Sequence, residues 1–213
     1  MKRNVLVVAL LAMVCSMKGQ SEVGTWSIMP RVGINSSNMS NQEISLAWID
    51  VKPTPSQEKS MRKLGLTTGV DISYQHAKKF STMMGVFYSH EGYTYTNFGQ
   101  QTFEYVDLSI VEDFYLLKGL ALKTGLLLGY LFDNEWKAEN VNDSYMRFNK
   151  WNLSLPIGIS YTFHHIVLDL RYQVGLLNMN KHKGEEPVYL PYFHQETYHS
   201  NSLWLTLGYN FVL

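Results

Sequence analysis

The sequence predicts an all-β fold, an eight-stranded antiparallel transmembrane β-barrel with short periplasmic turns and long extracellular loops. Two observations carry this prediction. Apolar and small polar residues alternate strictly in segments about ten residues long, and charged residues make up only 17% of the 213-residue chain. Ordinary soluble domains contain about 25% charged residues. Aromatic residues reach 14%, which suits strands that face lipid on one side.

The alternation is clearest between Trp151 and Leu176. Large apolar residues occupy every second position of two consecutive segments, a period of two that belongs to strands rather than helices. Each segment has about the length that a tilted strand needs to cross a bilayer. The polar side carries Asp169 and Arg171. A charge facing lipid at mid-bilayer costs about 2–4 kcal/mol, so this side must face the barrel interior. Pro156 removes a ladder hydrogen bond, and we expect a bulge or local break there.

Residues 1–20 have the pattern of a secretory signal, and residues 21–213 then form the barrel domain. Lys2 and Arg3 precede a short apolar run that ends at Val14. Cys15 raises the alternative of a lipoprotein, but Val14 is not the small residue that such a site requires. Removing the three basic residues of the signal leaves 15 basic and 18 acidic residues, a net charge of −3. This balance excludes the electrostatic footprint of a nucleic-acid-binding protein.

The eight predicted strands are joined by connections that alternate between long and short. They cover about residues 26–35, 64–74, 80–91, 104–115, 122–132, 151–162, 167–176 and 203–211. This alternation is typical of outer-membrane barrels, with both ends of the mature chain in the periplasm. Glu112 and Asp113 break the pattern of the fourth strand, and we expect both at the membrane surface. Outward aromatic residues should form two girdles: Trp26, Tyr74, Phe80, Tyr161, Tyr209 and Phe211 in the periplasmic one, and Tyr88, Tyr130, Phe132 and Trp151 in the outer one.

The inward positions include charges of both signs. An eight-stranded barrel has an interior just wide enough for its own side chains. Because buried charges must be paired, we predict a lumenal ion-pair network rather than a pore. The alternative is a path for protons or ions along the same charges. The network would comprise Arg31, Asp71, Asp107, Lys123, Asp169 and Arg171.

The candidate chemistry elsewhere is weaker, and we predict no metal, no cofactor and no catalytic site. The last long loop contains acceptable ligand types without a metal-binding spacing: His182, Glu185, Glu186, His194, Glu196 and His199. Ser89, His90 and Glu91 are adjacent, and adjacent strand residues face opposite sides, so they cannot form a triad alone. An outer-membrane lipid hydrolase or acyltransferase would need partners from other strands. A soluble lipocalin-like lipid-binding barrel is the third reading, but its outer surface would be glycine, serine and threonine.

Several segments resemble the PorT-like outer-membrane β-barrel family, a porin-like group of small barrels from Gram-negative, Bacteroidota-type bacteria. The segments are RVGINSSNMS (Arg31–Ser40), FYSHEGY (Phe87–Tyr93), YVDLSIVEDFYLLKGLALKTGLLLGYLF (Tyr105–Phe132), LDLRYQVGLLNM (Leu168–Met179) and LTLGYNF (Leu205–Phe211). Their order and spacing carry the resemblance, which implies an eight-stranded outer-membrane barrel without shared catalytic residues.

We therefore expect a structural or surface-recognition role in the cell outer membrane. Loops on a rigid scaffold usually carry function, and the two longest predicted loops are Ser36–Lys63 and Asn178–Asn201. Besides the surrounding lipid, a protein or glycan is the expected partner; the sequence does not specify an oligomeric state. The residues expected to anchor the partner are Trp48, Ile49, Tyr189, Tyr192 and Phe193.

Overall fold

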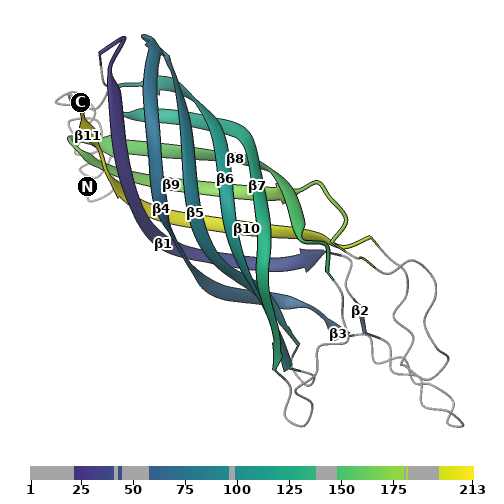
Figure 1. Ribbon diagram of the computed structural model, residues 1–213. Helices are drawn as coiled ribbons and strands as arrows, with labels where there is room; N and C mark the ends of the chain where they lie inside the picture. Colours follow the sequence, from purple (N-terminus) through teal and green to yellow (C-terminus); the bar gives the residue numbers. More distant parts are fainter. Residues whose placement is uncertain are drawn as a thin grey trace, which may run out of the picture.

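The described chain forms a closed antiparallel barrel of eight long strands, which confirms the predicted fold class (Figure 1). The computed structural model describes residues 22–40, 43–44, 58–95, 99–137, 148–179, 181 and 197–213; the predicted signal at 1–20 lies outside them. In this part of the chain, no helix is long and apolar enough to cross a membrane. The strands are β1 (Trp26–Ser40), β4 (Met61–Ala77), β5 (Phe80–Tyr95), β6 (Gly99–Leu117), β7 (Leu120–Lys137), β8 (Trp151–Phe163), β9 (Ile166–Gly175) and β10 (His199–Tyr209).

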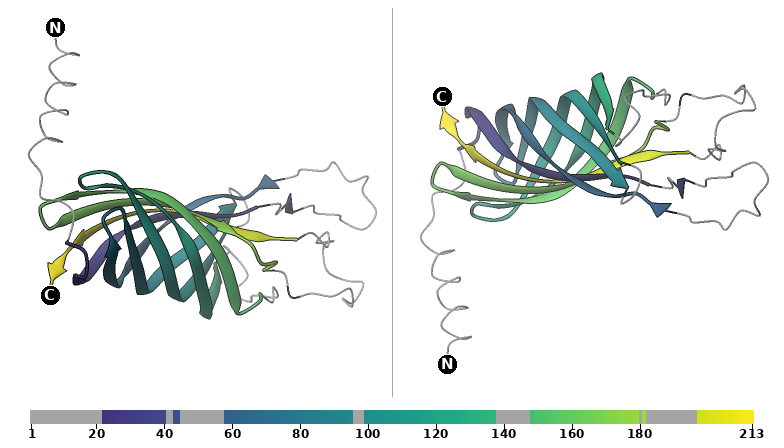
Figure 2. Two further views of the ribbon diagram at one scale, coloured as in Figure 1. Left: turned by 90° about the horizontal axis from the view of Figure 1, so that it is seen from above. Right: turned by 90° about the horizontal axis from the view of Figure 1, so that it is seen from below.

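The first and last long strands close the barrel. β1 pairs with β10 from Arg31 opposite Gly208 to Ser40 opposite His199. A short strand, β11 (Phe211–Val212), follows β10 and pairs with the start of β1. The two views in Figure 2 show the tilted strands of the wall that this closure produces. Closure leaves the long strands without a free edge, as a sheet in lipid requires.

The strands extend further at the loop end than the alternation predicted. β6 begins at Gly99 rather than near residue 104, and β7 continues to Lys137 rather than residue 132. Where a strand extends beyond the lipid, its outer face need not be apolar. The alternation of apolar and polar residues is therefore lost there, although the hydrogen bonds between the strands continue. Between β1 and β4, a small sheet of β2 (Glu43–Ile44) and β3 (Glu58–Lys59) lies beyond the loop end of the barrel (Figure 1).

The outer wall is apolar and carries aromatic residues near both ends. Val32 and Leu66, on neighbouring strands, are 59% and 61% exposed, which suits a surface solvated by acyl chains. At the turn end, the ring centroids of Trp26 and Tyr74 lie 4.6 Å apart. At the loop end, those of Tyr130 and Trp151 lie 4.9 Å apart.

Pro156 interrupts the wall without shifting it. β7 pairs with β8 in one register on both sides, from Leu120–Tyr161 to Thr124–Ile157 and again from Leu127–Ser154. The pairs that would involve Leu155 and Pro156 on this side are missing, whereas both residues pair with β9. The expected disturbance is therefore a local break rather than a bulge, because the missing amide hydrogen affects only one neighbour.

The side chain of Asn35 on β1 forms hydrogen bonds at a bulge between β4 and β5. The register shifts by one residue between Arg62 and Thr67. The Asn35 amide donates to the carbonyl oxygens of Leu66 and His90 at 3.1 and 3.0 Å. Buried polar side chains thereby satisfy backbone groups that the shifted ladder leaves unpaired.

Backbone hydrogen bonds also connect the short turns into a continuous periplasmic rim. Tyr115 N donates to Lys79 O, Thr162 N to Gly119 O, and Asn210 N to His165 O, at 2.9, 2.7 and 2.7 Å. Gly24 N donates to Gln75 O at 2.7 Å, so the chain before β1 joins the same rim. These bonds fix the turns relative to one another.

Substitutions at two glycines of the rim can distinguish the energetic cost of backbone strain from that of a steric clash. Both have positive φ, +81° at Gly119 and +91° at Gly24. An added Cβ at Gly119 would lie 2.5 Å from Thr162 O, whereas at Gly24 it would meet nothing within 4 Å. Gly24→Ala should cost only the strain of a positive φ, about 1–2 kcal/mol. Gly119→Ala should lower the free energy of unfolding by more than Gly24→Ala does, because it adds the clash with Thr162 O. Urea unfolding in lipid vesicles measures both losses. Equal costs would contradict this account.

Candidate functional site in the filled lumen

Six charged side chains form a connected network inside the barrel. Asp169 on β9 contacts three cations: Arg171 Nε at 2.6 Å, Arg31 Nη1 at 3.1 Å and Lys123 Nζ at 3.2 Å. Asp71 Oδ2 on β4 lies 2.7 Å from Arg31 Nε and 3.6 Å from Arg171 Nη2. Asp169 is therefore the centre of the network.

The network balances three positive charges with three negative ones. Asp113 on β6 is its sixth member, and Asp113 Oδ1 lies 2.7 Å from Lys123 Nζ. The charged side chains are at most 5% exposed. Removing one charge from such a site would leave a partner uncompensated in a low-dielectric environment.

Asp107 and Asp113 differ from the sequence-based expectation. Asp107, predicted inside the network, lies opposite Gly129 and Phe87, away from the three cations. Asp113, predicted at the membrane surface, is buried directly opposite Lys123. Glu112 does lie on the outer wall, where Thr82 Oγ1 donates to it at 2.7 Å. The alternation of apolar and polar residues correctly placed Asp107 inside the barrel. Which charged side chains form ion pairs depends in addition on the register between neighbouring strands.

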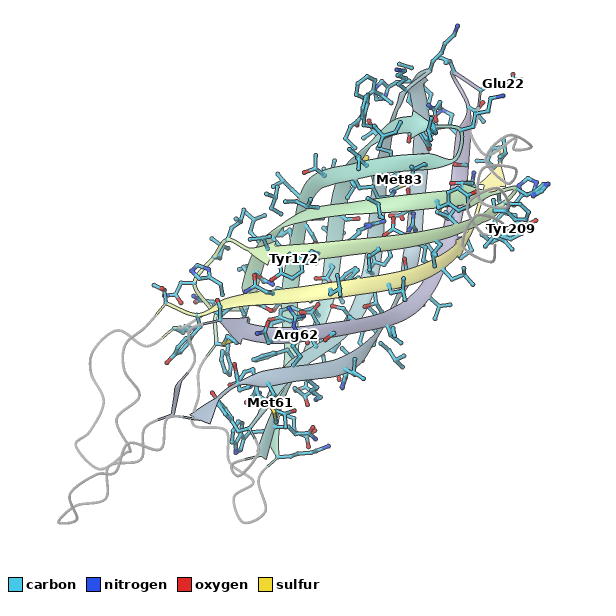
Figure 3. The ribbon with its side chains drawn as sticks, turned by 180° about the vertical axis from the view of Figure 1, so that it is seen from behind. Glu22, Met61, Arg62, Met83, Tyr172 and Tyr209 are labelled. Carbon is cyan, nitrogen blue, oxygen red and sulfur yellow. The ribbon has the colours of Figure 1, made fainter. Side chains whose placement is uncertain are left out.

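The thioether of Met83 lies between two of the cations. Its Sδ accepts weak hydrogen bonds from Arg31 Nη2 at 3.8 Å and Lys123 Nζ at 3.6 Å. Figure 3 labels Met83 in the half of the barrel that carries the short turns. A pocket adjoins this sulfur at the periplasmic end, and Arg31, Asp113 and Lys123 also line it. The ion pairs thus separate that pocket from the rest of the lumen.

Glycines face the lumenal charges across the strand pairs. An added Cβ at Gly85 would lie 2.1 Å from Asp71 Oδ1, and one at Gly208 would lie 3.0 Å from Arg31 Cγ. The long charged side chains therefore occupy the space that the glycines leave open. The opposed pairs are Arg31 with Gly69 and Gly208, Asp71 with Gly85, Asp107 with Gly129, and both Lys123 and Arg171 with Gly158.

An apolar cluster and two acids lie next to the network. Phe87, Leu127 and Trp204 pack together, and the Arg171 guanidinium lies 5.9 Å from the Phe87 ring centroid. Trp204 Nε1 donates to Glu91 Oε1 at 2.9 Å. Ser89 Oγ donates to Asp107 Oδ2 at 2.6 Å. These hydrogen bonds stabilise both buried acids.

The candidate triad residues are not assembled for catalysis. Ser89 and Glu91 are buried in the lumen, and Ser89 is engaged with Asp107. His90 lies on the other face of β5, with Nδ1 2.8 Å from Glu104 Oε1. The wall of the barrel thus separates the histidine from both neighbours.

A second, larger apolar cluster fills the loop end of the lumen. Rings of Phe103 and Phe148 pack edge to face with centroids 4.7 Å apart, and those of Tyr93 and Tyr95 lie 5.5 Å apart. The sequence did not predict this cluster because Tyr93, Tyr95 and Phe103 fall in a predicted loop, although the spacing of Tyr93 and Tyr95 continues the period of two. Its members are Met39, Tyr93, Tyr95, Phe103, Tyr105, Leu131, Phe148, Met179 and Tyr198.

Several predicted site residues lie outside the described residues: Trp48, Ile49, Tyr189, Tyr192 and Phe193, together with His182, Glu185, Glu186, His194 and Glu196. His199 is described and begins β10. Across the described ranges, no group of three or more His, Cys, Asp or Glu side chains is placed to hold a metal ion.

The network allows a test with a matched surface control. Asp169→Asn should lower the free energy of unfolding by about 3–5 kcal/mol, because it leaves buried cations uncompensated. Glu135→Gln removes the exposed ion pair with Lys137, whose Nζ lies 3.0 Å from Glu135 Oε2. This control should cost at most about 1 kcal/mol. Urea unfolding in lipid vesicles measures both, and similar losses would show that the lumenal pairing is not critical.

Comparison with solved structures finds outer-membrane barrels. The attachment invasion locus protein Ail of Yersinia pestis is 14% identical, covering 89% of this chain and 100% of its own, with a TM-score of 0.46. OprG from Pseudomonas aeruginosa is 13% identical, covering 89% and 97%, with a TM-score of 0.48. Neisserial surface protein A is 12% identical, covering 87% and 97%, with a TM-score of 0.49. No curated protein sequence matches.

The family assignment rests on the sequence itself. A family model described as "Outer membrane protein beta-barrel domain" matches residues 18–181, which is more than half of the chain. The apolar outer wall and the closed, charged interior are those of a barrel that spans lipid. The chain belongs to the outer membrane protein β-barrel domain family, and its place is the outer membrane.

Proposed function

We propose that this outer-membrane barrel acts through its extracellular loops, as a non-conducting scaffold for surface recognition. The observation that carries the proposal is the filled lumen. The ion network, the Phe87–Leu127–Trp204 cluster and the larger aromatic cluster occupy successive parts of the described interior. A barrel filled in this way leaves no continuous water-filled channel, whereas its wall holds the ends of the loops rigidly.

Four finer assignments are part of the proposal. Residues 1–20 serve as an export signal, and the chain is a PorT-like member of its family, as the order of its segments suggests. The protein is not an enzyme, since His90 and Ser89 are engaged with different partners on opposite faces of β5. The expected loop anchors Trp48, Tyr189, Tyr192 and Phe193 contact a protein or glycan.

Surface crosslinking on intact cells tests the loop role. Replacing Tyr189, Tyr192 and Phe193 together with serine should abolish partner capture, because aromatic anchors dominate recognition surfaces. The matched control replaces His182, Glu185 and Glu186 in the same loop with serine and should retain capture. Heat-modifiable gel migration verifies that both variants fold. Unchanged capture by the aromatic variant and by a deletion of residues 182–196 would contradict the proposal.

Because the lumen is filled, we expect the barrel not to conduct ions. Purified protein in planar bilayers should give no steady conductance, because the buried aromatic cluster at the loop end excludes a continuous water column. A known porin recorded under the same conditions serves as the positive control. Stable, ohmic steps from the folded protein would refute the scaffold role and favour ion passage along the lumenal charges.

A further inference from the structure

The periplasmic rim concentrates exposed basic side chains. The β4–β5 turn carries Lys78 and Lys79, the β6–β7 turn carries Lys118, and all three are exposed. The described acids near this rim are Glu22 and Glu112, and Glu112 Oε1 lies 3.2 Å from His76 Nε2. Among the described side chains the rim therefore carries three lysines against two acids, whereas the lipid-facing wall above it is apolar.

The backbone holds these cations in fixed positions. Lys79 O accepts the hydrogen bond from Tyr115 N, and Gly119 O, next to Lys118, accepts that from Thr162 N. The turns are thereby linked to the neighbouring strands. A ligand that binds several cations on such a rim loses little free energy to ordering of the backbone, because the backbone is already fixed.

The rim lies at the depth of lipid headgroups. Histidines near the turns stack on girdle aromatics: the ring centroids of His76, close to the end of β4, and Phe80 lie 6.2 Å apart, and those of His165 and Tyr209 lie 5.6 Å apart. Girdle aromatics of membrane proteins occupy the interface between acyl chains and water. Lysines within a few residues of this girdle face the headgroup phosphates, and long basic side chains extend readily toward them.

The loop end of the barrel carries cations and acids together. Lys137 forms an exposed ion pair with Glu135, and Lys63 donates a hydrogen bond to Thr102. Arg62 donates to Ser36 O at 2.6 Å, and its guanidinium lies 5.9 Å from the Tyr172 ring centroid (Figure 3). Acids such as Glu104 and Asp133 lie among these cations.

We propose that the periplasmic rim binds anionic phospholipid headgroups of the inner leaflet through Lys78, Lys79 and Lys118. The attraction combines three positive charges at headgroup depth with an aromatic girdle that fixes the height of the barrel. This lipid site is independent of the loops, so the recognition role and the lipid site can fail separately.

Native mass spectrometry of the protein released from nanodiscs tests the site. The discs contain phosphatidylethanolamine and phosphatidylglycerol, and the measurement counts the lipids of each kind that stay bound. Replacing the three lysines with glutamine should lower retention of phosphatidylglycerol by about threefold or more, since each lysine contributes to the attraction. Retention of the zwitterionic lipid should not change, and arginine at the same positions should preserve binding of phosphatidylglycerol.

The matched control neutralises three cations at the loop end, Lys137, Lys150 and Lys181, and should leave retention intact. Unchanged retention in the periplasmic variant, or an equal fall in the control, overturns the proposal. Co-sedimentation with purified peptidoglycan tests the other anionic surface of the periplasm. A variant that loses this co-sedimentation while retaining phosphatidylglycerol also overturns the proposal.

Discussion

The requirement that backbone polar groups be satisfied within lipid governs the whole structure. The wall must close because an open edge would leave amide and carbonyl groups without partners in hydrocarbon. Closure by pairing β1 with β10 gives eight strands, and eight strands enclose a space that only side chains can fill. The outward face must then be apolar, and the polar residues of each strand must find partners inside. The central position of Asp169 among three cations is one result of this constraint.

The sequence predicted the strands and their faces well because lipid imposes strict alternation. It predicted strand ends less well, since Tyr93 and Phe103 continue the ladder where the outer face no longer meets acyl chains. It also assigned Asp107 rather than Asp113 to the ion network. Alternation fixes the face of a residue, but only the β6–β7 register brings Asp113 opposite Lys123. The loop anchors lie outside the described residues, and loop conformation leaves no periodic signal in a sequence.

The interior divides into parts with different chemistry. Ion pairs occupy the region nearest the periplasmic pocket, and the Phe87–Leu127–Trp204 cluster separates them from Glu91 and Asp107. The aromatic cluster completes the filling at the loop end. Such a lumen stiffens the wall rather than conducting through it, and a stiff wall can tolerate the local break opposite Pro156. Rigid strands that end in long connections are the arrangement from which surface recognition usually arises.

The opposition of glycines and charges also bears on how the barrel assembles. A slip of two residues between β4 and β5 keeps every side chain on its proper face, so hydrophobicity alone does not prevent it. That slip would set Asp71 against Met83 or Phe87 instead of Gly85, and the carboxylate would lose the space that Gly85 leaves open. The correct alignment is thus encoded sterically as well as by the apolar face. The glycines opposite charged residues therefore favour the native strand alignment over its two-residue slips.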